Sequence, residues 1–352
     1  MKFKMIASVL IAVLLSNAAI FAMPDDRGAK KKRQTDRLVN LLPASDGIAV
    51  FESKRFLDEA LPRILTANQP MLAKITGHID MIRERAGIDV RKFDRVAVGV
   101  SYKTVSATET DYEPVIIATA TDLNYAALIT AAKTVAKGAY RTETVAGRTV
   151  SVFKLEPVKV AAKPAAAATN SKIAAAFDHV MKGLSKEIAV TNIDPNTIAI
   201  GTLRRVKETL SGSSHLGADL LGLLAGRDSG VMAFAMRPPG GMAKLLPLEY
   251  DELGQTLNSI TYIAGSLDVD PVGAGLHLLA RTKTPENALS LRDTLEVGQS
   301  FGKIAFAGKK RPDQLVYARM IESVKLSHHG TDVSVDVAVP QADIDVLVAE
   351  VK

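Results

Sequence analysis

The chain has 352 residues, of which 47% are hydrophobic but only 5% aromatic, and it contains neither Cys nor Trp. The absence of Cys excludes disulfides, thiolate catalysis, thiolate zinc sites and anchoring through an acylated cysteine. The scarcity of aromatic residues argues against surfaces that stack sugars or nucleic-acid bases. The 44 basic and 38 acidic residues give a formal charge of +6, and most of this excess lies near the N-terminus.

Residues 1–22 have the pattern of a secretory signal peptide. Two lysines precede the apolar run Met5–Leu15, and small residues continue to Ala22. Cleavage of this leader predicts export to the periplasm or the extracellular space. The alternative is an uncleaved N-terminal helix that anchors the protein, because Met5–Met23 is just long enough to span a bilayer.

The segment 23–40 is predicted to be a basic, disordered lead-in. Residues 23–37 hold six basic and three acidic side chains, a net charge of +3, and the leader contributes two more lysines. The folded body therefore carries only about +1. A body with so little excess charge is not typical of nucleic-acid-binding proteins, so we expect no nucleic-acid partner. The basic tail is suited to touch an anionic membrane surface.

Two segments of the body, 41–212 and 228–352, contain the same order of predicted elements, and we interpret them as duplicated halves. Each half opens with a strand and a helix, continues with two strands and a helix, and ends with a hairpin and a helix. The strands predicted in the first half are 48–51, 96–100, 115–119, 186–192 and 197–200, and those in the second half are 231–234, 260–264, 276–280, 323–327 and 332–337. The predicted helices are 71–86, 123–136, 171–184 and 203–210, a helix that begins after Thr284, and 341–348.

The first half is longer, and we expect its extra residues in three insertions. These are a loop at 102–113, a hairpin at 140–153 around Ala146-Gly147, and the Ala-rich linker 157–171. Loops absorb insertions at a small entropic cost, whereas a slipped strand would expose its apolar face.

Alternation in the last predicted strand indicates the fold class. Val333, Val335 and Val337 point to one side, and Asp332 and Ser334 point to the other. This pattern is typical of an antiparallel sheet with one polar face, and helices are expected on the apolar face. The prediction is an α+β fold with two similar halves, each a mainly antiparallel sheet with helices packed on one face.

One motif suggests a catalytic nucleophile. Gly298-Gln299-Ser300-Phe301-Gly302 matches the G-x-S-x-G pattern of serine hydrolases, and His328, His329 and Asp332 follow it. That motif works at a strand-to-helix turn that exposes the serine. Here the apolar spacing indicates one continuous helix through Ser300, with its stripe at Ala288, Leu291, Leu295, Gly298, Phe301 and Ala305. A serine hydrolase using Ser300 is kept as an alternative, and we assign no catalytic residue.

The sequence predicts no metal or cofactor site. His328 and His329 are adjacent, so on an extended chain they point to opposite sides, and a turn at 328–331 is their expected place. The other histidines, His78, His179, His215 and His277, are scattered, and the acidic pairs Asp268/Asp270 and Asp343/Asp345 flank turns and helix caps. The loop Arg237–Met242 is rich in Pro and Gly but lacks the ending of a phosphate-binding loop, so it is only a candidate for a mobile functional loop.

Three short segments carry a resemblance to a known group of proteins. Leu42–Asp46 and Ala86–Val90 precede predicted strands, and Val339-Pro340-Gln341 leads the last hairpin into a helix. With these features the chain resembles exported bacterial proteins of unknown function that are built from duplicated α+β halves. The resemblance implies an envelope location and no assigned activity. We therefore expect a non-catalytic envelope protein that binds another envelope protein or acts structurally, and the alternative is a carrier of an apolar ligand or lipid.

Overall fold

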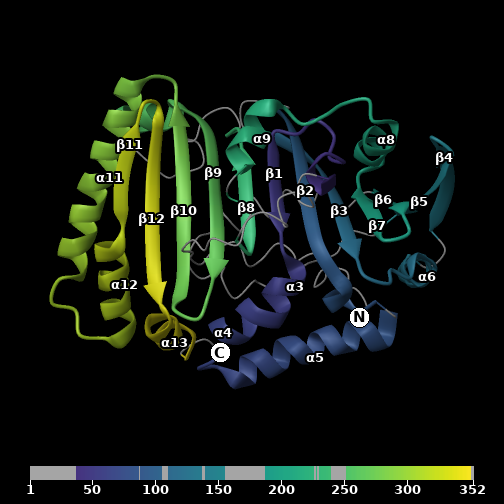
Figure 1. Ribbon diagram of the computed structural model, residues 1–352, viewed down its shortest axis with the longest axis horizontal. Helices are drawn as coiled ribbons and strands as arrows, with labels where there is room; N and C mark the ends of the chain where they lie inside the picture. The colour runs from purple at the N-terminus through teal and green to yellow at the C-terminus, as the bar shows by residue number, and fades with distance from the viewer. Residues whose placement is uncertain are drawn as a thin grey trace. The chain divides into compact units, whose positions relative to one another are not determined.

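The computed structural model describes residues 37–86, 88–104, 110–136, 139–154, 187–225, 227, 230–238 and 251–349 (Figure 1). The predicted signal peptide, most of the basic lead-in, the Ala-rich linker and the predicted helix 171–184 lie outside the described residues. The chain forms two compact units. Of the described residues, the first unit contains those in 37–54 and 75–218, and the second contains those in 55–74 and 219–349. The segment 55–74 thus belongs to the second unit, although it lies within the stretch predicted as the first half.

In the described part of the first unit, seven strands pair in the order β1-β2-β3-β7-β6-β5-β4, and every neighbouring pair is antiparallel. The strands are β1 Gly47–Phe51, β2 Phe93–Thr104, β3 Thr110–Ala120, β4 Tyr140–Val145, β5 Arg148–Lys154, β6 Glu187–Asp194 and β7 Thr197–Gly201.

The second unit contains five described strands in the order β8-β9-β10-β12-β11, again antiparallel throughout. They are β8 Met232–Met236, β9 Ile260–Val269, β10 Gly273–Thr282, β11 Lys325–His329 and β12 Asp332–Pro340.

The strand order of the second unit repeats that of five strands in the first. The strands β8, β9, β10, β12 and β11 take the places of β1, β2, β3, β7 and β6. The predicted repeat is therefore confirmed at the level of strand order, and the additional β4–β5 hairpin is the insertion expected at 140–153. Its turn residues Ala146 and Gly147 have φ values of 48° and 74°, which is the backbone that a two-residue hairpin turn requires.

The loop predicted at 102–113 is wrong for most of its length. Strands β2 and β3 stay paired through Tyr102 and Tyr112 to Thr104 and Thr110. The two tyrosine rings lie directly across the strands, with centroids 6.0 Å apart, and cross-strand aromatic pairs stabilise a hairpin. The residues beyond the tyrosines are polar, so the sequence pattern did not predict that the two strands extend this far.

The longer helices follow the expected start and stop signals. Thr284 accepts a hydrogen bond from the amide of Asn287 (3.3 Å) at the start of α11, and Asn124 does the same for Ala127 (2.9 Å) at the start of α6. The described helices are α3 Ser53–Arg55, the π-helical turn η1 Phe56–Ala60, α4 Leu61–Ile64, α5 Gln69–Ala86, the 3-10 turn η2 Val90–Lys92, α6 Tyr125–Val135, α8 Leu203–Ser211, α9 Ala218–Leu224, α10 Asp251–Asn258, α11 Pro285–Phe306, α12 Pro312–Ser323 and α13 Gln341–Ala349. The sequence pattern did not predict α3, η1, α4, α9 or α12, and it gave no bounds for α10.

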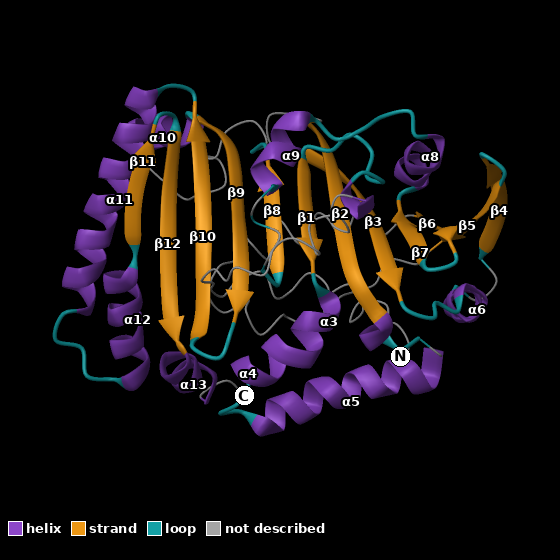
Figure 2. Ribbon diagram, in the orientation of Figure 1, coloured by secondary structure: helices purple, strands orange, loops and turns teal. Residues whose placement is uncertain are grey.

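The sheet of the second unit has one face covered by helices and one polar face, as predicted. Buried Val333 packs with Ala288 and Leu291 of α11, and Figure 2 shows α11 and α12 running alongside β11 and β12. On the other face, register places His277 opposite Asp336 and Arg281 opposite Asp332. In the first unit, Ile129 of α6 packs in the same way onto Phe153 and Val190. The α+β class is therefore confirmed. In the part of the chain that the structure describes, no helix is both long and apolar enough to cross a membrane.

Candidate docking surface

The candidate nucleophile Ser300 lies in the middle of a helix. Helix α11 runs without interruption from Pro285 to Phe306, so no strand-to-helix turn presents the serine. The Ser300 hydroxyl donates a hydrogen bond to the carbonyl oxygen of Glu296 (2.9 Å), one turn earlier in the same helix. This confirms the continuous helix that apolar spacing predicted, and it places the G-x-S-x-G match outside the geometry of a nucleophile elbow.

The expected partners of Ser300 do not converge on it. The Nδ1 atom of His328 lies 3.1 Å from Nη1 of Arg292, two helical turns before the serine. Asp332 lies on the opposite face of the sheet, where Arg281 donates two hydrogen bonds to its carboxylate (2.7 and 2.8 Å). The three residues of a hydrolase triad are therefore not assembled.

The histidines and acidic pairs have structural partners. The adjacent His328 and His329 both belong to β11, with their side chains on opposite faces of the strand, so the turn predicted at 328–331 is shorter and consists of Gly330 and Thr331. His277 bonds Asp336, with 2.5 Å between Nδ1 and Oδ1. Within the described ranges, no group of three or more His, Asp or Glu side chains is arranged to hold a metal ion; His179 lies outside them.

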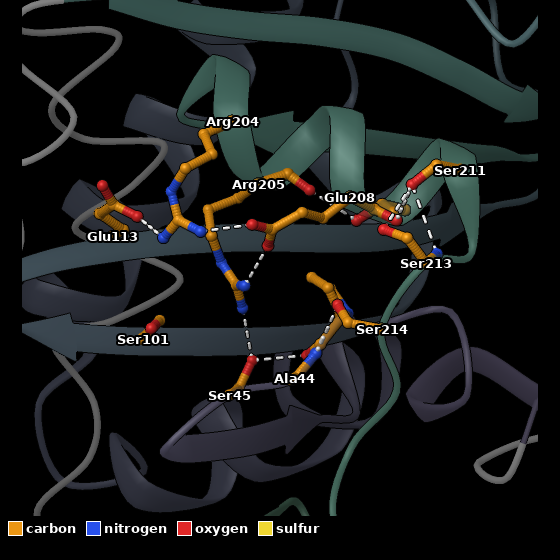
Figure 3. A network of polar contacts seen from close by, with 12 residues as sticks. Ala44, Ser45, Ser101, Glu113, Arg204, Arg205, Glu208, Ser211, Ser213 and Ser214 are labelled. Carbon is orange, nitrogen blue, oxygen red and sulfur yellow. Dashed lines mark hydrogen bonds and ion pairs between the residues drawn. The ribbon is translucent and has the colours of Figure 1, made fainter.

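A network of polar side chains surrounds Arg205 of α8 in the first unit (Figure 3). The guanidinium is 2% exposed and donates to Oε2 of Glu208 (2.5 Å) and to the hydroxyl of Ser45 (2.6 Å). Burial lowers the pKa of Arg205, although the nearby Glu208 carboxylate opposes the shift. Arg204 also contacts Glu208, and it forms a second ion pair with Glu113.

This network connects segments of the first unit, and its hydroxyl groups are not arranged as activated nucleophiles. The Ser45 hydroxyl donates its proton to the carbonyl oxygen of Pro43 (2.8 Å) and accepts from Arg205, so no base is placed to activate it. The amide of Ala44 donates to the hydroxyl of Ser214 (3.3 Å) on the segment after α8. The contacts therefore join the segment before β1 to α8 and to the residues that follow that helix.

A second polar cluster lies in the second unit, at the start of the loop that the sequence analysis singled out. Arg237 donates to Oδ2 of Asp219 (2.6 Å), and the hydroxyl of Tyr262 donates to the same oxygen. Arg237 also lies over the Tyr262 ring, with 5.6 Å from Cζ to the ring centroid. Residues 239–242 of the predicted loop lie outside the described residues.

This cluster predicts a loss of stability in strong acid. Burial raises the pKa of Asp219, but hydrogen bonds from Arg237, Tyr262 and the Leu220 amide outweigh it and lower the pKa to about 2. A lowered pKa stabilises the folded state above the ordinary value of 3.8, and this stabilisation disappears as the pH falls through about 2. Because the side chains are partly exposed, we expect only about 1 kcal/mol. Urea unfolding from pH 5 to pH 2 should show a smaller decrease for Asp219→Asn than for the wild type, and equal decreases would contradict the prediction.

Exposed apolar side chains gather on two neighbouring helices of the second unit. Of the eight large hydrophobic residues that are exposed in the described part of the chain, six belong to α11 and α12. Three of them, Val297, Phe301 and Ile304, are 55%, 67% and 72% exposed. Their spacing of four and three residues places them on one stripe of the C-terminal half of α11. We call these three residues the apolar ridge.

The ridge lies on the outer side of a helix that is already anchored by its inner side. Ala288 and Leu291 are buried against the sheet, and their direction is roughly opposite to that of Val297 on a helix of 3.6 residues per turn. The first half of the outer side carries Glu286, Ser290 and Asp293 beside the exposed Leu289, so the continuous apolar stripe is confined to the second half. The inner face of α11 already packs onto the sheet and anchors the helix. The ridge is therefore an exposed apolar surface that does not contribute to the core.

Helix α12 holds the ridge in place. Gln299 donates to the carbonyl oxygens of Ile321 (2.8 Å) and Val324 (3.0 Å), where α12 ends. At Gly302 a Cβ atom would lie 3.2 Å from Cδ1 of Ile321, so the glycine permits close packing of the two helices. Phe306 and Tyr317 add an aromatic contact with ring centroids 5.9 Å apart. The ridge is therefore presented on a supported hairpin of helices.

One member of the ridge, Phe301, lies on a different face of α11 from the one that apolar spacing predicted. The spacing grouped Phe301 in one apolar stripe with Leu291 and Leu295, whereas Phe301 is exposed and Leu291 is buried. The buried stripe continues instead through Gln299 and Gly302 toward α12. The recurrence of apolar residues at 297, 301 and 304 is a second stripe on the same helix, and this pattern was available as a signal.

No protein-family model matches the chain, and no curated protein matches it in sequence. Among solved structures, crystal form I of TP0453 is similar with a TM-score of 0.43 and 9% sequence identity, covering 90% of this chain and 98% of that chain. Crystal form III of TP0453 gives a TM-score of 0.43 and 10% identity, covering 88% of this chain and 97% of that chain. At this level the likeness assigns neither a family nor a function.

Proposed function

We propose that this protein is a non-catalytic, exported component of the bacterial envelope that docks on a lipid surface through the apolar ridge of α11. The single observation that carries the proposal is the exposure of Val297, Phe301 and Ile304 on one stripe of a well-anchored helix. Export is supported by the predicted leader at 1–22.

The size of the ridge suits reversible attachment to a bilayer. Removing an exposed apolar side chain from water contributes about 1–2 kcal/mol, so three of them supply about 3–6 kcal/mol. Amphipathic helices use such a stripe to lie in the plane of the membrane interface, with the apolar face in the acyl boundary and the polar residues in water. The inner face of α11 remains attached to its own sheet, so docking requires no unfolding.

The shape of the ridge favours a lipid over a protein partner. A stable protein interface buries about 800 Å² on each side and centres on a well-packed pocket. Three protruding side chains on the outer side of a helix supply neither that area nor a pocket. A bilayer surface accepts protruding apolar side chains without a complementary shape.

The proposal predicts that ridge substitutions abolish vesicle binding. In flotation with phosphatidylethanolamine–phosphatidylglycerol vesicles, Phe301→Ser combined with Ile304→Ser should lower the partition coefficient by more than about tenfold, since about 2–3 kcal/mol of apolar transfer is lost. Both side chains are exposed, so the thermal unfolding midpoint should change little.

The matched control is Val272→Ser in the same unit. Val272 is 80% exposed in the β9–β10 turn, away from the ridge, and its replacement should leave flotation unchanged. The proposal fails if the ridge variant floats as well as the wild type, or if Val272→Ser weakens binding to the same degree.

A further inference from the structure

We infer that the turn after α11, formed by Lys309, Lys310 and Arg311, binds acidic lipid headgroups and makes docking selective for anionic membranes. This inference rests on the proposed function, because it assigns the lipid class to the same surface. It is carried by a separate observation: Lys309 and Lys310 are exposed, and no ion pair holds either of them within the described residues.

From Val297 to the end of the turn, every charged residue is basic, and the acidic Asp293 and Glu296 lie on the side of the ridge away from the turn. Residues 297–311 contain four basic side chains and no acidic one, in a body whose net charge is about +1. Lys303, Lys309 and Lys310 are exposed, and among the described residues no carboxylate lies within ion-pair distance of them. Arg311 differs, because Asp313 accepts two hydrogen bonds from it (both 3.1 Å). Within the described residues, Lys303, Lys309 and Lys310 thus have no carboxylate partner, and all three lie within or just after the segment that carries the ridge.

The turn places its lysines directly beyond the ridge. Helix α11 ends at Phe306, the amide of Ala307 still donates to the carbonyl oxygen of Ile304 (3.2 Å), and Gly308 reverses the chain with a φ of 72°. The amide of Lys309 then returns to the carbonyl oxygen of Phe306 (3.3 Å). Lys309 and Lys310 therefore follow Ile304 by five and six residues across a tight turn, and their long side chains are suited to reach headgroups while the ridge enters the acyl boundary.

Helix electrostatics explain only part of this cluster. Lys303 lies in the last turn of α11, where the helix dipole favours a cation in any protein. Lys309 and Lys310 follow the helix end and gain less from the dipole, which falls off within the last turn. The exposed ring of Tyr317, which contacts Phe306, adds an aromatic side chain of the kind that is enriched at membrane interfaces.

The test compares vesicles of phosphatidylcholine alone with vesicles that also contain phosphatidylglycerol. The wild type should bind the anionic vesicles more tightly, and added salt should weaken that preference. Lys309→Ser combined with Lys310→Ser should lower the partition coefficient on anionic vesicles roughly 10- to 30-fold, as expected from about 1 kcal/mol per basic residue near such a surface. Binding to phosphatidylcholine alone should stay unchanged.

The matched control removes the same charge elsewhere, through Lys92→Ser combined with Lys283→Ser, two exposed lysines outside the turn. This control should retain the anionic preference, and the basic lead-in 23–37 is identical in all variants, so it cannot produce a difference between them.

Millimolar inorganic phosphate should not displace the protein from vesicles; displacement would assign the turn to free anions. Equal wild-type binding to both vesicle types, or equal effects of the two double variants, would overturn the inference while leaving lipid docking intact. If the wild type bound neither vesicle type, the proposed function itself would be overturned.

Discussion

Replacing Arg205 with Ala should lower the free energy of unfolding of the first unit by about 3–5 kcal/mol. The substitution removes a buried side chain and leaves the Glu208 carboxylate without the cation that is buried beside it. The guanidinium donates to both Glu208 and Ser45, and it is almost completely withdrawn from solvent. Its removal leaves a cavity and takes away the donor that Ser45 accepts from. The segment before β1 would then lose its connection to α8.

The neighbouring Arg204 provides the control for this prediction. It contacts the same Glu208 and also Glu113, but its side chain is 53% exposed, so Arg204→Ala should cost less than about 1 kcal/mol. Urea unfolding gives the total loss, and hydrogen exchange read by mass spectrometry should show faster exchange in peptides of β1 and α8, with little change in the second unit. Equal losses for the two arginines would mean that the surface ion pairs, and not burial, hold this region together.

Much of the fold was predictable because its strands and helix ends carry local signals. The alternation of Val333 and Val335 with Asp332 and Ser334 fixed one polar face, and the start signals at Thr284 gave the beginning of α11. The repeated strand order followed from five matched strands in each half. The apolar spacing also predicted a continuous helix through Ser300, which the structure confirms, although a hydrolase using Ser300 was kept as an alternative.

The remaining features depend on contacts between distant residues, which periodicity does not reveal. Helix α12 was missed although Pro312 and Asp313 are ordinary start signals and half of its residues are apolar. The pairing of Arg205 with Ser45 spans 160 residues in the sequence. The ridge on α11 was hidden because a second apolar stripe was assigned to the buried face. Signal cleavage, the absence of catalysis and the alternative of an apolar-ligand carrier stay predictions.

A buried ion pair attaches the segment 55–74 to the sheet of the second unit. The Nη2 atom of Arg55 lies 2.7 Å from Oδ1 of Asp268 in β9, and the Asp268 side chain is 8% exposed. Further along the same segment, Asn68 donates to the carbonyl oxygen of Val348 (2.7 Å), and the carbonyl oxygen of Arg63 accepts from Gln341 (2.9 Å). The segment is thus held at several points, and the ion pair is the one that includes a buried charge.

Arg55→Ala should destabilise the second unit by about 3 kcal/mol at pH 7, because it leaves the Asp268 carboxylate buried without its cation. Burial already raises the pKa of Asp268, against the effect of Arg55, so removing Arg55 should raise it further. A carboxyl group with a raised folded pKa costs stability where it is ionised, and this cost is relieved as the pH falls through that pKa. The deficit of Arg55→Ala should therefore be largest at neutral pH and shrink in acid.

Adding Asp268→Asn should recover more than half of it at pH 7, because the amide carries no charge to bury. A deficit that is independent of pH, or one that Asp268→Asn does not relieve, would show that Arg55 stabilises the unit through its packing and its contact with Glu59 instead of through this ion pair.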